Sequence, residues 1–155
     1  MKILFLHGFG AQPGGLKPTY LIGRGLEVMN PALPNDDFDA AVLTAQAAFD
    51  AGQPAVVAGS SMGGAVAMNI ETAGVPLVLI CPAWRHWGAA RTVKANTTIL
   101  HSENDEVVPF EDSVELCRAS NLPESALWVV GDGHRLVDDA SLDAQYRAIC
   151  KAAKR

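Results

Sequence analysis

Pro54-Ala-Val-Val-Ala58-Gly59-Ser60-Ser61-Met62-Gly63 is the stretch of sequence that decides the expected fold. Its last five residues match the pattern G-x-S-x-G, in which the central serine occupies a sharp turn between a buried strand and a helix. The flanking glycines let neighbouring backbone approach that turn without a Cβ clash. The pattern predicts that Ser61 is a nucleophile and that the Met62 N–H, at the helix start, can donate to a developing oxyanion.

Two other interpretations of this stretch remain open. A glycine-rich turn in which Ser61 only caps the following helix would have a similar composition. Ser60 is a second hydroxyl beside the first, although it lies off the centre of the motif.

Short apolar runs recur along the rest of the chain, which is typical of strands buried on both faces of a parallel sheet. We expect strands at residues 3–6, 26–29, 55–58, 77–80, 97–100 and 127–130, and helices at residues 17–25, 37–49, 62–72, 110–120 and 138–154. Strands that alternate with helices predict right-handed crossovers. The expected architecture is α/β, with a six-stranded, mainly parallel sheet and helices on both faces, in one domain covering residues 1–155.

The strand expected at residues 97–100 runs into an acidic loop that contains Glu103, Asp105 and Glu106. The carboxyl ends of the strands are where ligands bind in open α/β sheets. In folds with this serine turn, the acid follows the serine along the chain and the histidine follows the acid. Any of the three carboxylates could therefore be the acid partner of Ser61, and an ordinary solvated acidic loop is the other interpretation.

The strand expected at residues 127–130 runs into a loop in which Gly131 and Gly133 flank the approach to His134. His134 therefore has the chain order and the placement of a catalytic base, which would take the serine proton and return it to the leaving group. We interpret His86 and His101 as structural, because neither ends a strand after the acid.

Composition and charge argue against several other classes of protein. The net charge is −5, and the only basic run is the terminal Lys151-Ala-Ala-Lys154-Arg155, so we expect no nucleic-acid partner. The three cysteines lie far apart and show no zinc spacing, which predicts free thiols and no bound metal. We find no signal-peptide pattern and no apolar run long enough to span a membrane, so we expect a cytoplasmic protein.

Five motifs along the chain resemble the small single-domain bacterial esterases of the YqiA type, which have the α/β-hydrolase fold. The matching stretches are His7-Gly8-Phe9, Gly59-Ser-Ser-Met-Gly-Gly64, Cys81-Pro82-Ala83, Asp105-Glu-Val and Gly133-His134. The resemblance implies that Asp105, before Val107-Val108-Pro109, is the acid of a Ser61–Asp105–His134 triad, and that the Phe9 N–H is the second oxyanion donor. It also implies an esterase or thioesterase acting on acyl esters without a metal or cofactor.

The segment after the strand at residues 77–80 is expected to bear on substrate size. Larger hydrolases insert a lid here, but residues 81–95 leave room for little more than a loop and one short helix. Trp84 or Trp87 could form an apolar wall of an open cleft, with Arg85 or Arg91 meeting any anionic part of the substrate. Anchoring of this loop on the core is an equally consistent interpretation.

We therefore expect a small-molecule ester or thioester with a short acyl chain as the partner of this site. A non-catalytic binding protein with the same fold, or an amidase or peptidase with the same triad, are the alternatives. The natural substrate and the oligomeric state do not follow from the sequence.

Overall fold

The apolar runs form strands that are buried on both faces of one sheet. In the computed structural model, which describes residues 1–154, the strands are β1 (Lys2–Leu6), β2 (Glu27–Met29), β3 (Val56–Ser60), β4 (Leu77–Ile80), β5 (Thr98–His101) and β6 (Leu127–Val129). Every neighbouring pair is parallel, in the order β2-β1-β3-β4-β5-β6. The expectation of a six-stranded, mainly parallel sheet is confirmed, and the sheet is wholly parallel.

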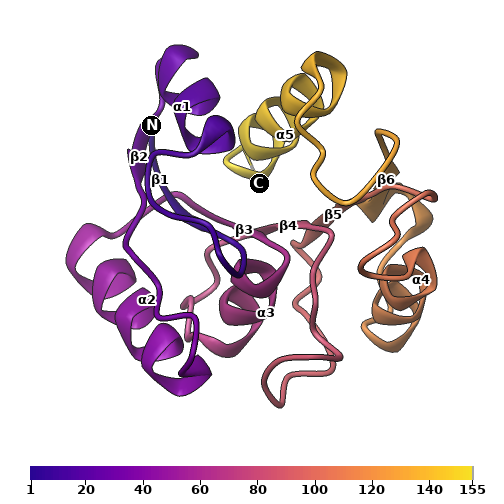
Figure 1. Cartoon of the computed structure of the whole chain (residues 1–155), viewed down its shortest axis with the longest axis horizontal. Coiled ribbons are helices and arrows are strands. Elements are labelled where there is room, and N and C mark those ends of the chain that lie inside the picture. The colour runs from indigo at the N-terminus through magenta and orange to yellow at the C-terminus, as the bar shows by residue number, and fades with distance from the viewer. Residues whose placement is uncertain (155) are drawn as a thin grey trace.

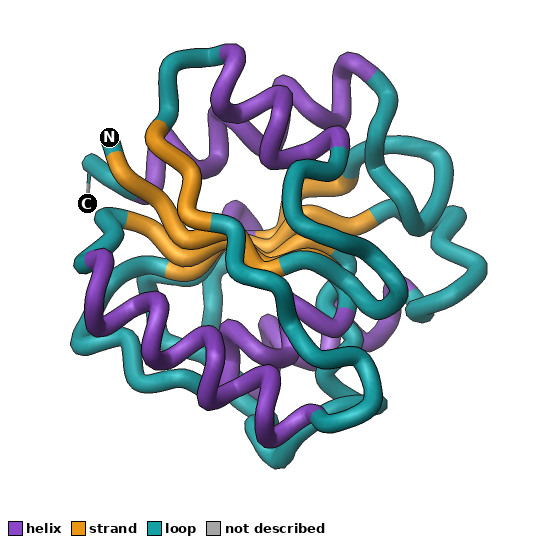
Figure 2. Tube along the Cα trace, turned by 60° about the vertical axis from the view of Figure 1, so that its left-hand side comes forward, coloured by secondary structure: helices purple, strands orange, loops and turns teal. Residues whose placement is uncertain are grey.

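Helices cover both faces of this sheet (Figure 1). The helices are α1 (Leu16–Gly23), α2 (Phe38–Gly52), α3 (Met62–Asn69), α4 (Phe110–Ala119) and α5 (Asp139–Ala152), with a short 3₁₀ turn at Glu124–Ala126. Helices α1 and α5 lie on one side, and α2, α3 and α4 on the other, as the edge-on view in Figure 2 also shows. None of the helices within residues 1–154 is long and apolar enough to cross a membrane.

Alternate side chains of each strand enter the two cores. Leu4 and Leu6 of β1 face the core formed with α2, α3 and α4, whereas Ile3 and Phe5 face the core formed with α1 and α5. All four side chains are at most 2% exposed. The continuous apolar runs in the sequence thus reflect strands that face a hydrophobic core on each side.

The helix ends differ from the expected ones by a few residues, for local reasons. Helix α2 continues to Gly52 and is capped by Gln53, which adopts a left-handed conformation with φ of 48°. Helix α3 ends at Asn69 because Ile70 is already extended. Residues 81–97 contain no helix, so the segment with room for a loop and one short helix is a loop throughout.

The carboxyl ends of the strands position the functional side chains. The chain passes from β1 to β2 on one side and then returns to place β3 on the other side of β1. Such a reversal leaves a crevice between the carboxyl ends of β1 and β3, where ligands of open α/β sheets bind. Ser61 follows β3 directly, and the loop after β1 lies beside it.

Candidate active site

Ser61 occupies a strained turn between β3 and α3. Its φ is 55° and its ψ is −116°, a conformation that a non-glycine residue adopts only when the surrounding structure holds it. The side chain makes no capping hydrogen bond to the helix. Instead, Ser61 Oγ lies 3.0 Å from His134 Nε2. The geometry therefore favours the nucleophile over the capping interpretation.

Two glycines of the motif are needed because backbone passes where a Cβ would be. A Cβ at Gly59 would overlap the backbone of Gly63, and a Cβ at Gly63 would overlap the carbonyl groups of Leu6 and His7. Helix α3 thus starts directly against the end of β1. This contact brings the loop that follows β1 to Ser61.

Gly63→Ala is expected to destabilise the protein by about 3 kcal/mol or more, because the clash is with strand backbone that cannot move aside. Gly23→Ala is the matched control, since a Cβ at Gly23, in the last turn of α1, meets nothing within 4 Å. Urea denaturation would measure both changes. Equal stability of the two variants would show that the approach of α3 to β1 is not constrained in this way.

His134 connects the serine to a buried carboxylate. Its Nδ1 lies 2.7 Å from Asp105 Oδ2, and the Asp105 side chain is fully buried while that of His134 is 16% exposed. Neither Glu103 nor Glu106 forms a hydrogen bond or an ion pair with this histidine. The structure therefore brings Ser61, His134 and Asp105 together in the order that a catalytic triad requires.

The Asp105 carboxylate accepts four hydrogen bonds. Its Oδ1 accepts from the amides of Val107 and Val108, both at 2.8 Å, and its Oδ2 accepts from His134 and His101. Burial alone would raise the pKa of Asp105, but the hydrogen bonds from His134, Val108 and Val107 outweigh it and hold the pKa below its usual value. The group is therefore kept as a carboxylate that can orient His134.

His101 is a fourth member of this network, and its bond to Asp105 goes beyond the structural role expected from the sequence. Its Nε2 lies 3.0 Å from both Asp105 Oδ2 and the carbonyl oxygen of Val108. A carbonyl can only accept, so Nε2 carries the proton, and Nδ1 accepts from the Ser113 hydroxyl at 2.6 Å. Burial lowers the pKa of His101, which keeps the ring neutral. The signal in the sequence was its position four residues before Asp105, at the end of a strand.

The lowered pKa of His101 gives an expected pH dependence of stability. Below about 6.5, the usual histidine pKa, the unfolded chain takes up a proton that the folded chain refuses, so the free energy of unfolding falls. His101→Gln removes the titrating ring, so this loss is absent in the variant. The difference in the free energy of unfolding between the wild type and His101→Gln should therefore shrink from pH 7 to pH 5. Urea denaturation at these pH values measures it, and a difference that stays constant would contradict the buried neutral ring. Asp105 contributes little to this change between pH 7 and pH 5. Its pKa is lowered in the folded protein, so the stability that it contributes is lost mainly below pH 3.8.

The two expected oxyanion donors lie on either side of Ser61. A Cβ at Gly8 would be 3.3 Å from the Ser61 Cβ, so the loop after β1 runs directly along the serine. The Ala11 amide donates to the Gly8 carbonyl, and Gly10 has φ of 72°, which forms a turn that leaves the Phe9 N–H without a partner in residues 1–154. The Met62 N–H, at the first position of α3, has no intrahelical acceptor.

His7 holds this loop in place. The Leu33 amide donates to His7 Nε2, and His7 Nδ1–H in turn donates to the Gly8 carbonyl, both at 2.9 Å. The sequence motif His-Gly was recognised, but not this role of its histidine.

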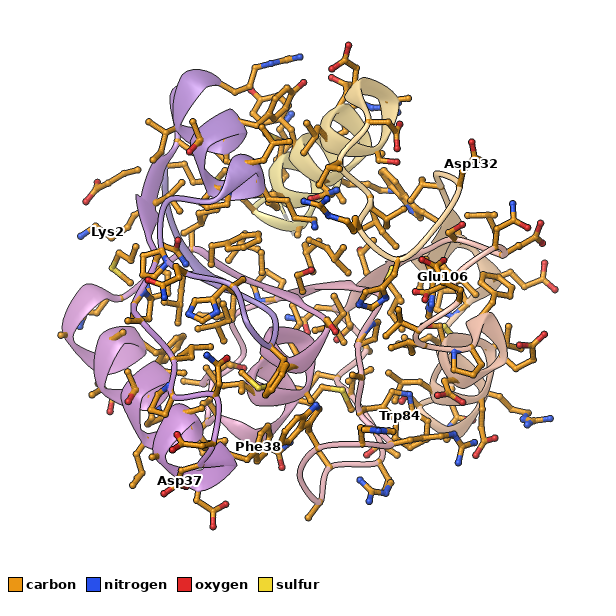
Figure 3. The ribbon with its side chains drawn as sticks, in the orientation of Figure 1. Lys2, Asp37, Phe38, Trp84, Glu106 and Asp132 are labelled. Atoms are coloured by element: carbon orange, nitrogen blue, oxygen red, sulfur yellow. The ribbon has the colours of Figure 1, made fainter. Side chains whose placement is uncertain are left out.

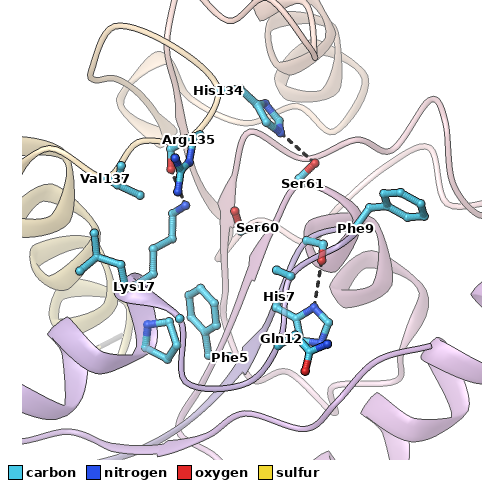
Figure 4. A pocket seen from close by; sticks show the side chains of 15 residues that line it. Phe5, His7, Phe9, Gln12, Lys17, Ser60, Ser61, His134, Arg135 and Val137 are labelled. Atoms are coloured by element: carbon cyan, nitrogen blue, oxygen red, sulfur yellow. Dashed lines mark hydrogen bonds between the residues drawn. The ribbon is translucent and has the colours of Figure 1, made fainter. Parts of the chain in front are cut away.

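A cleft of about 250 Å³ opens beside Ser61 and His134 (Figure 4). This volume is slightly below the roughly 300–1,000 Å³ of pockets for drug-sized ligands. The loop after β1, the start of α1 and the loop after His134 line the cleft, with side chains that include Phe5, Phe9, Gln12, Lys17, Arg135 and Val137.

The structure does not place the expected aromatic wall along this cleft. Trp84 is 3% exposed and donates through Nε1 to the Asp112 carbonyl, beside α4 (Figure 3). Arg85 pairs with Asp112 and Glu115, carboxylates of α4. Trp84 thus anchors the loop on the core and Arg85 ties it to α4, and neither residue lines the cleft. This agrees with the anchoring interpretation and corrects the expected substrate role of both residues. Arg91 likewise bonds backbone carbonyls of its own segment.

Trp87 has a different position from the other two expected substrate residues. Its ring stacks between Phe9 and Phe38, with ring centroids 6.0 and 5.7 Å away. It therefore supports the Phe9 side chain, which lines the cleft, without lining the cleft itself.

One group of side chains in residues 1–154 has the spacing of a metal site, and it overlaps the triad. Ligand atoms of Cys81, Asp105 and His134 lie within 4.8 Å of one another. The carboxylate and the imidazole already bond each other, and burial and the neighbouring Asp105 raise the pKa of the Cys81 thiol, which favours the neutral form. These donors suit a hydrogen-bonded triad better than a metal ion, which needs a thiolate and free donors.

No protein-family model and no curated protein matches this chain. Solved structures match it over its whole length. A protein of the α/β hydrolase superfamily from Xanthomonas campestris pv. campestris is 25% identical, with a TM-score of 0.79, and the match covers 99% of this chain and 96% of that one. Mouse alpha/beta hydrolase domain-containing protein 10 is 12% identical, with a TM-score of 0.79 and coverage of 99% and 89%.

The esterase domain of a Rhodothermus marinus protein is also similar, at 20% identity, with a TM-score of 0.68 and coverage of 99% and 86%. The structural neighbours are members of the α/β hydrolase superfamily, and this chain has their fold from end to end. The expected fold class is thereby confirmed.

Proposed function

We propose that this chain is a serine esterase or thioesterase that hydrolyses small acyl esters through an acyl-enzyme. The observation that carries the proposal is the hydrogen-bonded chain from Ser61 Oγ through His134 to Asp105, built on a strained serine turn. Strain of this kind persists where the surrounding structure imposes it, and it is concentrated at functional sites. The esterase domain among the structural neighbours supports the same reaction class.

In the first half of the proposed reaction, Ser61 Oγ attacks the acyl carbonyl carbon while His134 Nε2 takes its proton. The carbonyl oxygen becomes an oxyanion that accepts hydrogen bonds from the Phe9 and Met62 amides. The bond to the leaving oxygen or sulfur then breaks, and His134 returns the proton to that atom. An alcohol or thiol leaves, and the acyl group stays on Ser61.

In the second half, water takes the place of the leaving group. His134 removes a proton from the water as it attacks the acyl-serine carbonyl, and the collapsing intermediate releases a carboxylic acid and restores Ser61. Asp105 stays a carboxylate throughout and stabilises the imidazolium. The proposal needs no metal or cofactor, and the cytoplasmic location remains a prediction from the sequence.

The small open cleft leads us to expect a preference for short acyl chains. Each buried methylene contributes about 0.8 kcal/mol, so kcat/KM should rise with chain length only until the chain leaves the cleft. A series of p-nitrophenyl esters and acyl-CoA thioesters from two to sixteen acyl carbons measures the maximum and the preferred leaving atom, with Ser61→Ala as the blank. A strong preference for emulsified long-chain triglycerides over soluble short esters would contradict the proposed substrate class.

A further inference from the structure

Two cationic side chains share the cleft with Ser61, and no carboxylate of residues 1–154 lines it. Lys17 comes from the first turn of α1, and Arg135 directly follows His134 in the loop before α5. Within residues 1–154, neither forms a salt bridge with an aspartate or glutamate. The chain as a whole has a net charge of −5, whereas the cleft beside Ser61 carries two cations and is therefore locally positive.

Lys17 lines the cleft, and it is half-buried. Its Nζ donates to the carbonyl oxygen of Arg135, so the ammonium is held against the loop that carries His134 and Arg135 (Figure 4). Burial lowers the pKa of Lys17, and the neighbouring Arg135 lowers it further, although nearby Cys81 opposes this. An anion bound between the two side chains would offset both effects, because it supplies the missing counter-charge.

The first turn of α1 adds to the positive potential of the same cleft wall. Residues 15–18 line the cleft, and no side chain caps this helix at Gly15. The partial positive charge of a helix N-terminus thus faces the same space as the two cations.

We propose that Lys17 and Arg135 form a subsite for a carboxylate or similar oxyanion carried by the ester or thioester substrate. The inference rests on the proposed hydrolase function and names its substrate class: a short acyl ester with one anionic group close to the scissile bond. The subsite replaces Arg85 as the expected partner of an anionic group, because Arg85 is already paired with two carboxylates of α4.

A purely structural role of Lys17 makes a different prediction. The hydrogen bond to the Arg135 carbonyl could serve only to hold the His134 loop, and its loss would then slow the hydrolysis of every ester alike. Arg135→Met separates the two roles, because it removes the guanidinium and leaves the carbonyl that Lys17 bonds. The informative quantity is therefore the ratio of kcat/KM between an anionic ester and its neutral counterpart, not either value alone.

Two matched ester pairs test the proposal. Monoethyl succinate against ethyl butyrate places the carboxylate on the acyl side, and 4-acetoxybenzoate against its methyl ester places it on the leaving-group side. In one of the pairs, Lys17→Met and Arg135→Met should each lower the anionic-to-neutral ratio of kcat/KM about tenfold at low salt. A tenfold change corresponds to about 1.4 kcal/mol, which is the order of the interaction energy of two charges about 4 Å apart near a protein surface. Added salt should reduce the effect. Lys2→Met is the control, since Lys2 begins β1 at the opposite end of the strands and points away from the molecule (Figure 3).

Unchanged ratios in both pairs, with neutral esters still hydrolysed, would overturn the subsite alone. A protein that hydrolysed none of the four esters would instead count against the proposed function, and binding then decides the subsite. In that case, NMR titration of Ser61→Ala should show monoethyl succinate binding more tightly than ethyl butyrate, with the preference lost in Ser61→Ala/Arg135→Met. Equal binding of the two esters would overturn the subsite.

Discussion

Ser61→Ala is expected to lower kcat by at least ~10³-fold, because the substitution removes the atom that forms the acyl bond. The fold should persist, since within residues 1–154 the Ser61 hydroxyl forms a hydrogen bond with His134 alone. Steady-state hydrolysis of the best ester of the series, together with circular dichroism and thermal unfolding, measures both effects.

Ser60→Ala is the matched control for this substitution. Ser60 carries the neighbouring hydroxyl and also lines the cleft, but it ends β3 and forms no hydrogen bond with the triad. Ser60→Ala should therefore lower kcat far less than Ser61→Ala does. Near-wild-type activity of Ser61→Ala in a folded protein would show that another group performs the chemistry.

Asp105→Asn should have the second-largest effect, a loss of about 10³–10⁴-fold in kcat. The amide can donate to His134 Nδ1, which would hold the ring in the tautomer whose Nε2 already carries a proton and cannot accept one from Ser61. The substitution also removes the charge that stabilises the imidazolium. In addition, His101 and the amides of Val107 and Val108 all donate to this carboxylate. The NH₂ group of an asparagine cannot accept these hydrogen bonds, so at least one donor loses its partner in either orientation of the amide.

Glu106→Gln provides the comparison for Asp105→Asn, because it removes a carboxylate from the same loop at an exposed position. It should leave kcat within a few-fold of the wild type. A similar loss in the two variants would indicate a general electrostatic effect of the acidic loop and would contradict a specific role of Asp105.

The sheet, and the approach of Ser61 and His134 to the acidic loop, could be predicted because each has a local signature. Continuous apolar runs identify strands buried on both faces, and Gly59-Ser60-Ser61-Met62-Gly63 places the serine after one of them. Asp105 and His134 follow later strands in the same way. Since parallel strands bring their carboxyl ends to one edge, chain order was enough to expect Ser61, His134 and an acid of this loop together. The choice of Asp105 over Glu103 and Glu106 rested on the family resemblance.

The cleft and its charges could not be predicted, because they depend on contacts between distant segments. Lys17 and Arg135 meet only because α1 and the His134 loop lie on the same side of the sheet. For Trp84 and Arg85 the sequence left two interpretations open, because their position near the expected mouth does not reveal which way the side chains turn. The ring turns into the core, and the guanidinium turns to carboxylates of α4.

The most direct test of the account is to identify the residue that carries a covalent adduct. The protein is treated with a fluorophosphonate, which reacts with activated serines, and the digested protein is analysed by peptide mass spectrometry. We predict a single adduct on Ser61 that is absent in Ser61→Ala and strongly slowed in His134→Ala. An adduct on Ser60 instead, or a folded wild-type protein that forms none, would contradict the proposal that Ser61 is the nucleophile.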